Sequence, residues 1–205
     1  MSLLKILIVG ATLVSFYCVL EYIKRKYRLD PRLTRKIAHI LSGGIAVVLL
    51  RIFSYSEFLT TALLFTVFFA LSLWKKWLHS IHLTTRVTYG EILYPVGLFS
   101  VVLFYSYNAF IVTTSILVLA LADPAAEWIG STAKKQGKSP AGSLAFFAVT
   151  VITIVAMCKF FGIPLRGTNI LMIALITTVI EAISLWGTDN VTIPLSSAAL
   201  LQLLL

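Results

Sequence analysis

The sequence predicts an all-α, polytopic integral membrane protein in which about seven or eight transmembrane helices form one bundle. Of its 205 residues, 59% are hydrophobic and 12% are charged, whereas soluble domains are about half apolar and a quarter charged. Mean hydropathy is +0.96, and apolar runs of about 20 residues, long enough to cross a bilayer, recur along the chain. Neither an internal repeat nor a low-complexity linker interrupts residues 1–205, so we expect a single membrane domain.

The first three runs show how the spans are bounded. Run 3–20 precedes the basic cluster Lys24-Arg25-Lys26, whereas a secretory signal has its charges in front. We therefore expect residues 1–22 to be an uncleaved anchor helix with its N-terminus outside. The second helix is expected to begin at Asp30-Pro31, a cap followed by proline at the first helical position. The third run covers residues 57–73, and the later runs cover 92–107, 110–122, 141–161, 170–186 and the short 191–205.

Basic residues set the expected orientation. Seventeen Lys and Arg oppose eight Asp and Glu, which gives a net charge of +9. These residues flank apolar spans, so they favour cytoplasmic loops over a nucleic-acid surface. With eight spans and an outside N-terminus, thirteen of the seventeen lie on the cytoplasmic side, and the other four are Lys5, Arg51, Lys159 and Arg166.

Two groups of potential metal ligands receive a structural interpretation. Cys18 and Cys158 both fall inside apolar runs, so they predict neither a disulfide framework nor a metal site. His79 and His82 form an H-x-x-H pair without nearby cysteines or acids. We interpret them as residues of the membrane interface.

The start of the second helix carries a basic face. Arg32, Arg35, Lys36 and His39 follow the spacing i, i+3, i+4, i+7 and therefore share one side of a helix. Cations are disfavoured at the positive end of the helix dipole, so a bound anion would explain them. An anchor to the cytoplasmic side of the membrane explains the same pattern.

The stretch 119–143 departs most from a plain membrane span. Asp123 precedes Pro124, which predicts an N-cap and a new short helix over 124–135. Glu127 stands one turn after Asp123, so the two carboxylates can converge. The turn 136–140 carries Lys138 beside small residues, where backbone N–H groups are accessible to an anion. Acids, a lysine and such a turn suit a metal-bound polyphosphate, while an ordinary basic loop is the alternative interpretation.

The expected orientation brings these residues to one membrane face. The cytoplasmic side receives Arg35, Lys36, His39, Glu91, Asp123, Glu127, Lys138 and Asp189. Glu181 lies near that side within an apolar run, where an ionisable residue is a functional candidate by default. We therefore predict one polar site beneath the cytoplasmic surface, able to meet a soluble charged cosubstrate.

Several short motifs share their order and spacing with a known family. They are Arg35-Lys36-x-x-His39, Asp123-Pro-Ala-Ala, Gly130, Gly137-Lys138-Ser139, Gly142-Ser143, and Gly187-Thr-Asp189-Asn190 with Pro194. The chain resembles the polyprenol kinase family over about residues 30–200. That family includes dolichol, phytol and farnesol kinases and the CTP-dependent diacylglycerol kinase. Some relatives have Glu before the Gly-Ser pair, where this chain has Ala141, so a role for that carboxylate does not carry over.

The resemblance implies transfer of the terminal phosphate of a nucleoside triphosphate, usually CTP, to a lipid alcohol such as a polyprenol, phytol or diacylglycerol. A divalent cation such as Mg²⁺ is implied as well. We expect Asp123 to bind the metal or position the attacking hydroxyl, and His39 to orient a phosphate or carboxylate. The further metal-binding candidates are Asp189, Glu127 and Glu91. The expected phosphate-binding residues are Arg35, Lys36, Lys138, Gly130, Gly137, Ser139, Gly142 and Ser143.

Three alternatives stay open at this point. A cytidylyltransferase acting on a lipid phosphate would release pyrophosphate instead of CDP. A small ion-coupled transporter would use Glu181 and Asp123 as a relay, although the chain has no inverted repeat. A scaffold without chemistry would leave the converging acids unexplained. The lipid, the organelle and the oligomeric state do not follow from the sequence.

Overall fold

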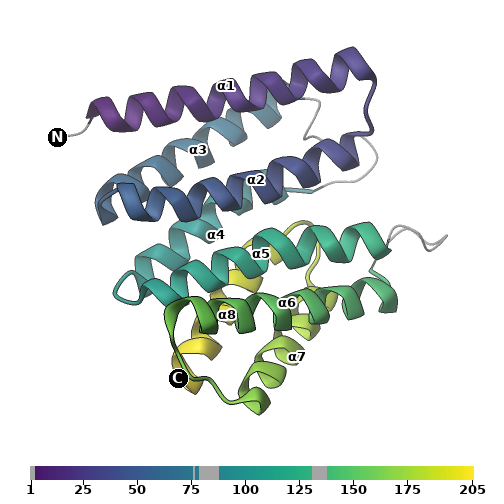
Figure 1. Ribbon diagram of the computed structural model, residues 1–205. Coiled ribbons are helices and arrows are strands. Elements are labelled where there is room, and N and C mark those ends of the chain that lie inside the picture. Colours follow the sequence, from purple (N-terminus) through teal and green to yellow (C-terminus); the bar gives the residue numbers. More distant parts are fainter. Residues whose placement is uncertain (1–2, 76, 79–87, 131–137) are drawn as a thin grey trace.

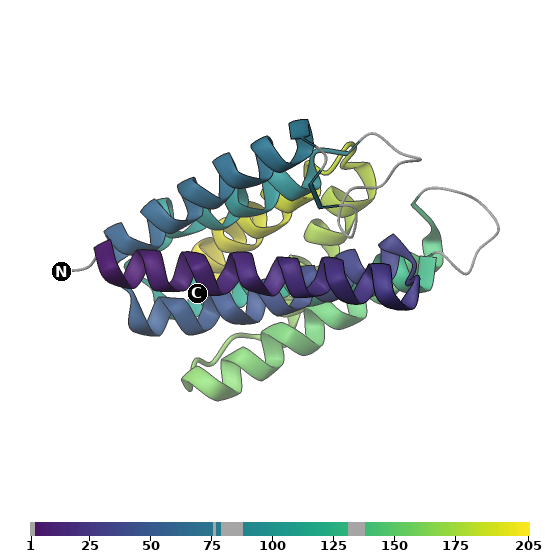
Figure 2. The ribbon, with the colours of Figure 1, turned by 90° about the horizontal axis from the view of Figure 1, so that it is seen from above.

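The computed structural model describes residues 3–75, 77–78, 88–130 and 138–205. Within these ranges the chain is all-α and contains no strand, which confirms the predicted fold class. Successive helices run back and forth along one bundle, and Figures 1 and 2 show this from two directions. The helices are α1 (Leu3–Tyr27), α2 (Pro31–Ile52), α3 (Tyr55–Lys75), α4 (Gly90–Tyr105), α5 (Ala109–Gly130), α6 (Pro140–Phe161), α7 (Gly167–Ile183) and α8 (Asp189–Leu204).

Five of the described helices have the length and composition of a membrane span. Helices α1, α2, α3, α5 and α6 are long and apolar enough to cross a bilayer. Helices α4 and α7 are apolar but have 16 and 17 residues, which corresponds to about 24–26 Å against a hydrocarbon thickness of about 30 Å. Large apolar side chains such as Leu7, Val48 and Leu63 are exposed on the outer faces, as expected for surfaces that contact lipid tails.

Helix α5 forms the centre of the bundle. Fourteen of its 22 residues are buried, whereas only four of the 25 residues of α1 are. Helix α5 packs against α2, α4, α6 and α8, while α1 contacts α2 and α3 at the edge. Polar side chains carried by the last turns of α5 therefore lie close to other helices.

The prediction of a helix start at Asp123 is wrong. Helix α5 continues without interruption from Ala109 to Gly130, and both Asp123 and Pro124 lie inside it. Proline removes one backbone donor, but neighbouring helices in a membrane bundle tolerate such a break. Asp123 therefore projects from the side of a packed helix, and Glu127 follows one turn later on the same helix.

Other boundaries follow local cap chemistry more closely. The side chain of Asp30 accepts a hydrogen bond from the Arg32 N–H, and α2 begins at Pro31 as predicted. Ser139 caps α6 by accepting from the Gly142 N–H at 3.1 Å. Helix α1 extends to Tyr27 beyond the predicted run, and α7 ends at Ile183, earlier than predicted.

Candidate active site

Helices α2 and α5 face each other in an antiparallel arrangement that brings distant polar residues together. The Nη2 atom of Arg35 lies 2.7 Å from Oε2 of Glu127. One turn further along α2, Nε2 of His39 lies 4.0 Å from Oδ2 of Asp123. The predicted basic face of α2 therefore lies against the predicted acidic pair, which now belongs to α5.

A glycine sets how closely the two helices approach. A Cβ atom added at Gly43, one turn beyond His39, would lie 2.2 Å from Cβ of Ala120. Such a distance is far below van der Waals contact, so only glycine permits this crossing. At the adjacent Gly44, an added Cβ would have nothing within 4 Å, because this residue faces outward. Gly43 therefore fixes the register that pairs His39 with Asp123.

Two residues, Leu119 and Tyr94, hold His39 in place. Its Nε2 lies 3.2 Å from the carbonyl oxygen of Leu119, and its ring lies 4.4 Å from the ring of Tyr94, centroid to centroid. The Tyr94 hydroxyl donates a hydrogen bond to the His39 carbonyl. This packing fixes the ring next to Asp123 and suits His39 to an orienting role.

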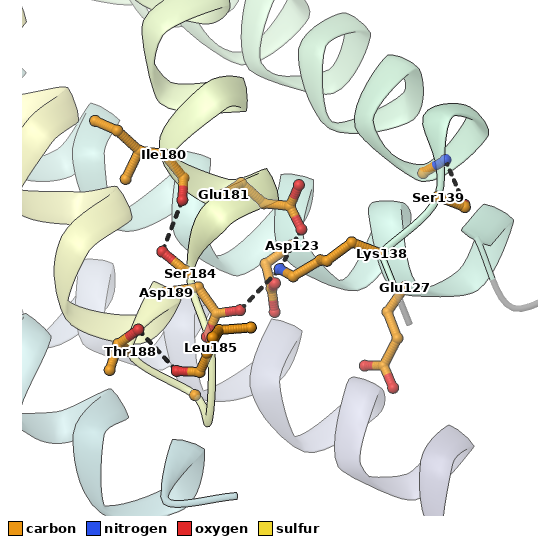
Figure 3. A network of polar contacts seen from close by, with 12 residues as sticks. Asp123, Glu127, Lys138, Ser139, Ile180, Glu181, Ser184, Leu185, Thr188 and Asp189 are labelled. Atoms are coloured by element: carbon orange, nitrogen blue, oxygen red, sulfur yellow. Dashed lines mark hydrogen bonds and ion pairs between the residues drawn. The ribbon is translucent and has the colours of Figure 1, made fainter. Parts of the chain in front are cut away.

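Lys138 forms the second half of the site. Its ammonium group donates to a carboxylate oxygen of Glu181 in α7 and, at 3.0 Å, to Oδ2 of Asp189 at the start of α8. Figure 3 shows the Lys138 side chain pointing to these two carboxylates and toward Asp123. Burial lowers the pKa of Lys138, but the Asp189 and Glu181 carboxylates outweigh burial and raise that pKa above its usual value. Lys138 is therefore a cation at neutral pH.

Asp123 connects the two halves. It lies within electrostatic range of Asp189, Lys138, Glu127 and Arg35, and its side chain is 19% exposed. A partly accessible carboxylate with cations on both sides can hold a metal-bound phosphate or receive a proton from a nearby hydroxyl. The site therefore combines residues of α2, α5, α7 and α8 with the residue that precedes Ser139.

Two further predicted residues lie near the α2–α5 pair. The Lys36 ammonium lies 6.0 Å from the Trp128 ring centroid in a cation–π arrangement. Glu91 is buried at the start of α4, and its charge acts on Arg35. Both residues thus border the site.

The small residues near Ser139 have a packing role. A Cβ added at Gly142 would lie 2.7 Å from the Ala126 carbonyl oxygen, and one at Gly130 would lie 2.9 Å from Oγ of Ser139. The Ser143 N–H donates to the Ser139 carbonyl in the first turn of α6. These residues let α5 and α6 approach closely, and a phosphate contact by their backbone stays a prediction. Gly137, His79, His82 and the predicted helical segment 131–135 lie outside the described residues.

The described residues do not form a complete metal-binding site by themselves. Among the described residues, no group of three or more His, Cys, Asp or Glu side chains gathers in a way that could hold a metal ion. Glu127 is paired with Arg35, and Glu181 with Lys138. Mg²⁺, however, is usually bound by one or two carboxylates together with substrate phosphates and water. Asp123 and Asp189, whose charges act on each other, are the candidates for that mode, and Oδ2 of Asp189 also accepts from Lys138.

The four tryptophans indicate the depth of the site. Trp74 and Trp77 lie at the end of α3 and just beyond it, Trp128 lies near the end of α5, and Trp186 lies in the α7–α8 turn; all four are exposed. Each belongs to the same end of the bundle as Lys138 and Glu127. Tryptophan is enriched where the bilayer meets water, so we expect the polar site to lie at interface depth.

Some participants have no clear sequence signal. Tyr94 sits in an apolar run, and nothing in its neighbours indicates that its ring packs on His39. Glu181 could be recognised as an acid within a span, but its partner Lys138, 43 residues away, could not. The comparisons add no assignment, because no family model, curated protein or solved structure matches the chain.

Proposed function

We propose that the protein is a membrane-embedded kinase that transfers the terminal phosphate of CTP, or another nucleoside triphosphate, to a lipid alcohol. The main support is the cluster of alternating charges at one end of an apolar bundle: Arg35 with Glu127, and Lys138 with Glu181 and Asp189, on either side of Asp123. The motif resemblance described above supports the same chemistry. The interface depth of the cluster suits a reaction between a soluble nucleotide and a lipid hydroxyl.

The cations have donors available for phosphate. Lysine has three N–H donors, and among the described residues Glu181 and Asp189 take two of those of Lys138. Arginine has five, and Glu127 engages one nitrogen of Arg35. Both side chains can therefore bind phosphate oxygens without leaving their carboxylates. Lys36, whose ammonium lies near the Trp128 ring, would add positive charge at the edge of the site.

In the proposed reaction the lipid hydroxyl oxygen attacks the terminal phosphorus, and the bond from that phosphorus to the bridging oxygen breaks. The nucleoside diphosphate leaves, and the hydroxyl proton passes to the Asp123 carboxylate. His39, packed between Leu119 and Tyr94, orients Asp123. Mg²⁺, held by Asp189 together with the phosphates, would neutralise charge on the phosphates.

The proposal is tested with purified protein in lipid nanodiscs. Radiolabelled CTP, ATP and UTP are each combined with phytol, geranylgeraniol, dolichol and diacylglycerol, with and without Mg²⁺. Magnesium-dependent formation of a lipid monophosphate from at least one pair is expected. Failure of every pair would refute the kinase assignment.

A further inference from the structure

An apolar pocket lies directly behind the polar site. Its walls come from α1, α2, α3 and α4, and they include Tyr17, Ala46, Phe65 and Leu98. The pocket is partly open to the outside, and three of its four wall helices are long enough to span a membrane. Its walls therefore belong to helices that lipid tails would surround.

Tyr94 belongs to both the pocket and the site. It lines the pocket, while its ring packs on His39 and its hydroxyl donates to the His39 carbonyl. On α2, the lining residues from Ser42 to Leu49 continue away from His39 along the helix axis. At the rise of an α-helix, those residues extend over roughly 10 Å toward the middle of the bilayer. The pocket thus lies next to the site, and Tyr94 separates the two.

The residues that line the pocket favour an apolar ligand. Among the residues that the structure describes, no charged side chain lines the pocket. The hydroxyl groups of the wall already have partners: Tyr17 pairs with Ser42 at 2.6 Å, Thr61 donates to the Glu57 carbonyl, and Tyr94 donates to His39. A polar ligand would find no partners here for its own hydrogen-bonding groups, and burying those groups unpaired would weaken its binding.

We infer that this pocket between α1, α2, α3 and α4, with a volume of about 60 Å³, holds the few carbons of the acceptor lipid nearest its hydroxyl, with the lipid hydroxyl beyond Tyr94 at His39 and Asp123 and the rest of the chain in the bilayer. The inference rests on the proposed function for the identity of the lipid as acceptor. The loosely packed α1, of which only four residues are buried, forms the side wall through which the chain enters from the bilayer.

The test uses a prenyl alcohol that carries a photoreactive diazirine on its chain, with the full-length protein in nanodiscs. Ala46→Phe fills the pocket, because Ala46 is a buried lining residue. Val48→Phe adds bulk to the same helix at a position that is 56% exposed outside the pocket. We expect crosslinks on Phe65 and Leu98, a loss of about tenfold in their yield in Ala46→Phe, and no loss in Val48→Phe. Excess unlabelled prenyl alcohol should compete.

Ala46→Leu, a smaller change, replaces Ala46→Phe if the latter does not yield monodisperse protein. Crosslinking that neither pocket variant reduces, or that excess alcohol does not compete, would identify bulk membrane lipid on the outer surface and overturn the inference. Labelling requires no turnover. If the protein has no kinase activity, but its pocket is labelled and excess alcohol competes with that labelling, the proposed function is refuted. The inference that the pocket binds hydrocarbon would still hold.

Discussion

Arg35 of α2 and Glu127 of α5 form an ion pair of 2.7 Å although 92 residues separate them in the chain. Their side chains are 24% and 32% exposed, so water screens the pair and its contribution to stability is modest. Its value is geometric, because it holds a cation beside Asp123 while leaving further guanidinium donors for a phosphate. Substitutions in this pair can therefore distinguish effects on the stability of the fold from effects on activity.

Exchanging the two charges should restore folding without restoring activity. Arg35→Glu and Glu127→Arg are each expected to lower the melting temperature, and the double variant should recover about 2–4 °C, as expected for a coupling of about 1 kcal/mol. The double variant should still have a raised KM for nucleotide, since the arginine now extends from α5. Melting curves and initial rates check both parts. Full recovery of nucleotide affinity would show that only net charge matters there.

Two adjacent glycines offer a matched test of the α2–α5 crossing. Gly43→Ala would place a methyl group 2.2 Å from Cβ of Ala120, so we expect a loss of about 1–3 kcal/mol and of the His39–Asp123 contact. Gly44→Ala meets open space and should be neutral or stabilising by up to about 1 kcal/mol. Thermal unfolding and turnover of both variants measure the difference. Equal effects would contradict the role of Gly43 in setting the register.

Removing the Lys138 ammonium should weaken nucleotide binding, because a phosphate loses its partner. It should also lower the stability of the fold, because Glu181 loses its partner. Lys138→Ala is expected to raise the KM for nucleotide more than the KM for lipid, because we propose that the ammonium binds phosphate as a point charge. It also leaves Glu181, whose side chain is 3% exposed, without its cation, at a cost of up to about 3 kcal/mol. Kinetic constants for both substrates and melting temperatures distinguish the two effects.

Adding Glu181→Gln to Lys138→Ala should recover stability but not the KM for nucleotide. Lys159→Ala, an exposed lysine in the last turn of α6, serves as the control and should change neither. A KM effect confined to the lipid would remove Lys138 from the nucleotide site.

Asp123→Asn should lower turnover by about 10²–10⁴-fold, the range for loss of a general base, while the protein stays inserted and monodisperse. Glu57→Gln is the matched control, because Glu57 lies at the opposite end of the bundle and accepts a hydrogen bond from the Ser54 N–H that glutamine can also accept. Turnover and size-exclusion profiles are compared. Unchanged turnover in Asp123→Asn would exclude Asp123 from the chemistry.

Much of this arrangement could be predicted because it depends on local chemistry. Apolar runs predicted the membrane helices, and the Asp30-Pro31 cap predicted the start of α2. Spacing of three and four residues placed Arg35 and His39 on one face, and both contact α5. The grouping of distant polar residues at one end followed from counting spans, since each span reverses the direction of the chain.

The rest depends on packing between helices. Pro124 reads locally as a helix start, yet α5 continues because α2, α4, α6 and α8 surround it. The choice of Glu127 over Asp123 as the partner of Arg35 depends on the register set by Gly43 and Ala120. No local pattern encodes that register, because it arises where two segments far apart in the sequence meet.

The central claim is tested most directly by following where the nucleotide label goes. Purified protein is given a lipid alcohol, Mg²⁺ and CTP labelled either on the terminal phosphate or on the phosphate next to the ribose. We predict label in the lipid from the terminal position only, with release of CDP and loss of transfer in Asp123→Asn. Transfer of the inner label, or of neither label from any nucleoside triphosphate, would contradict phosphoryl transfer at this site.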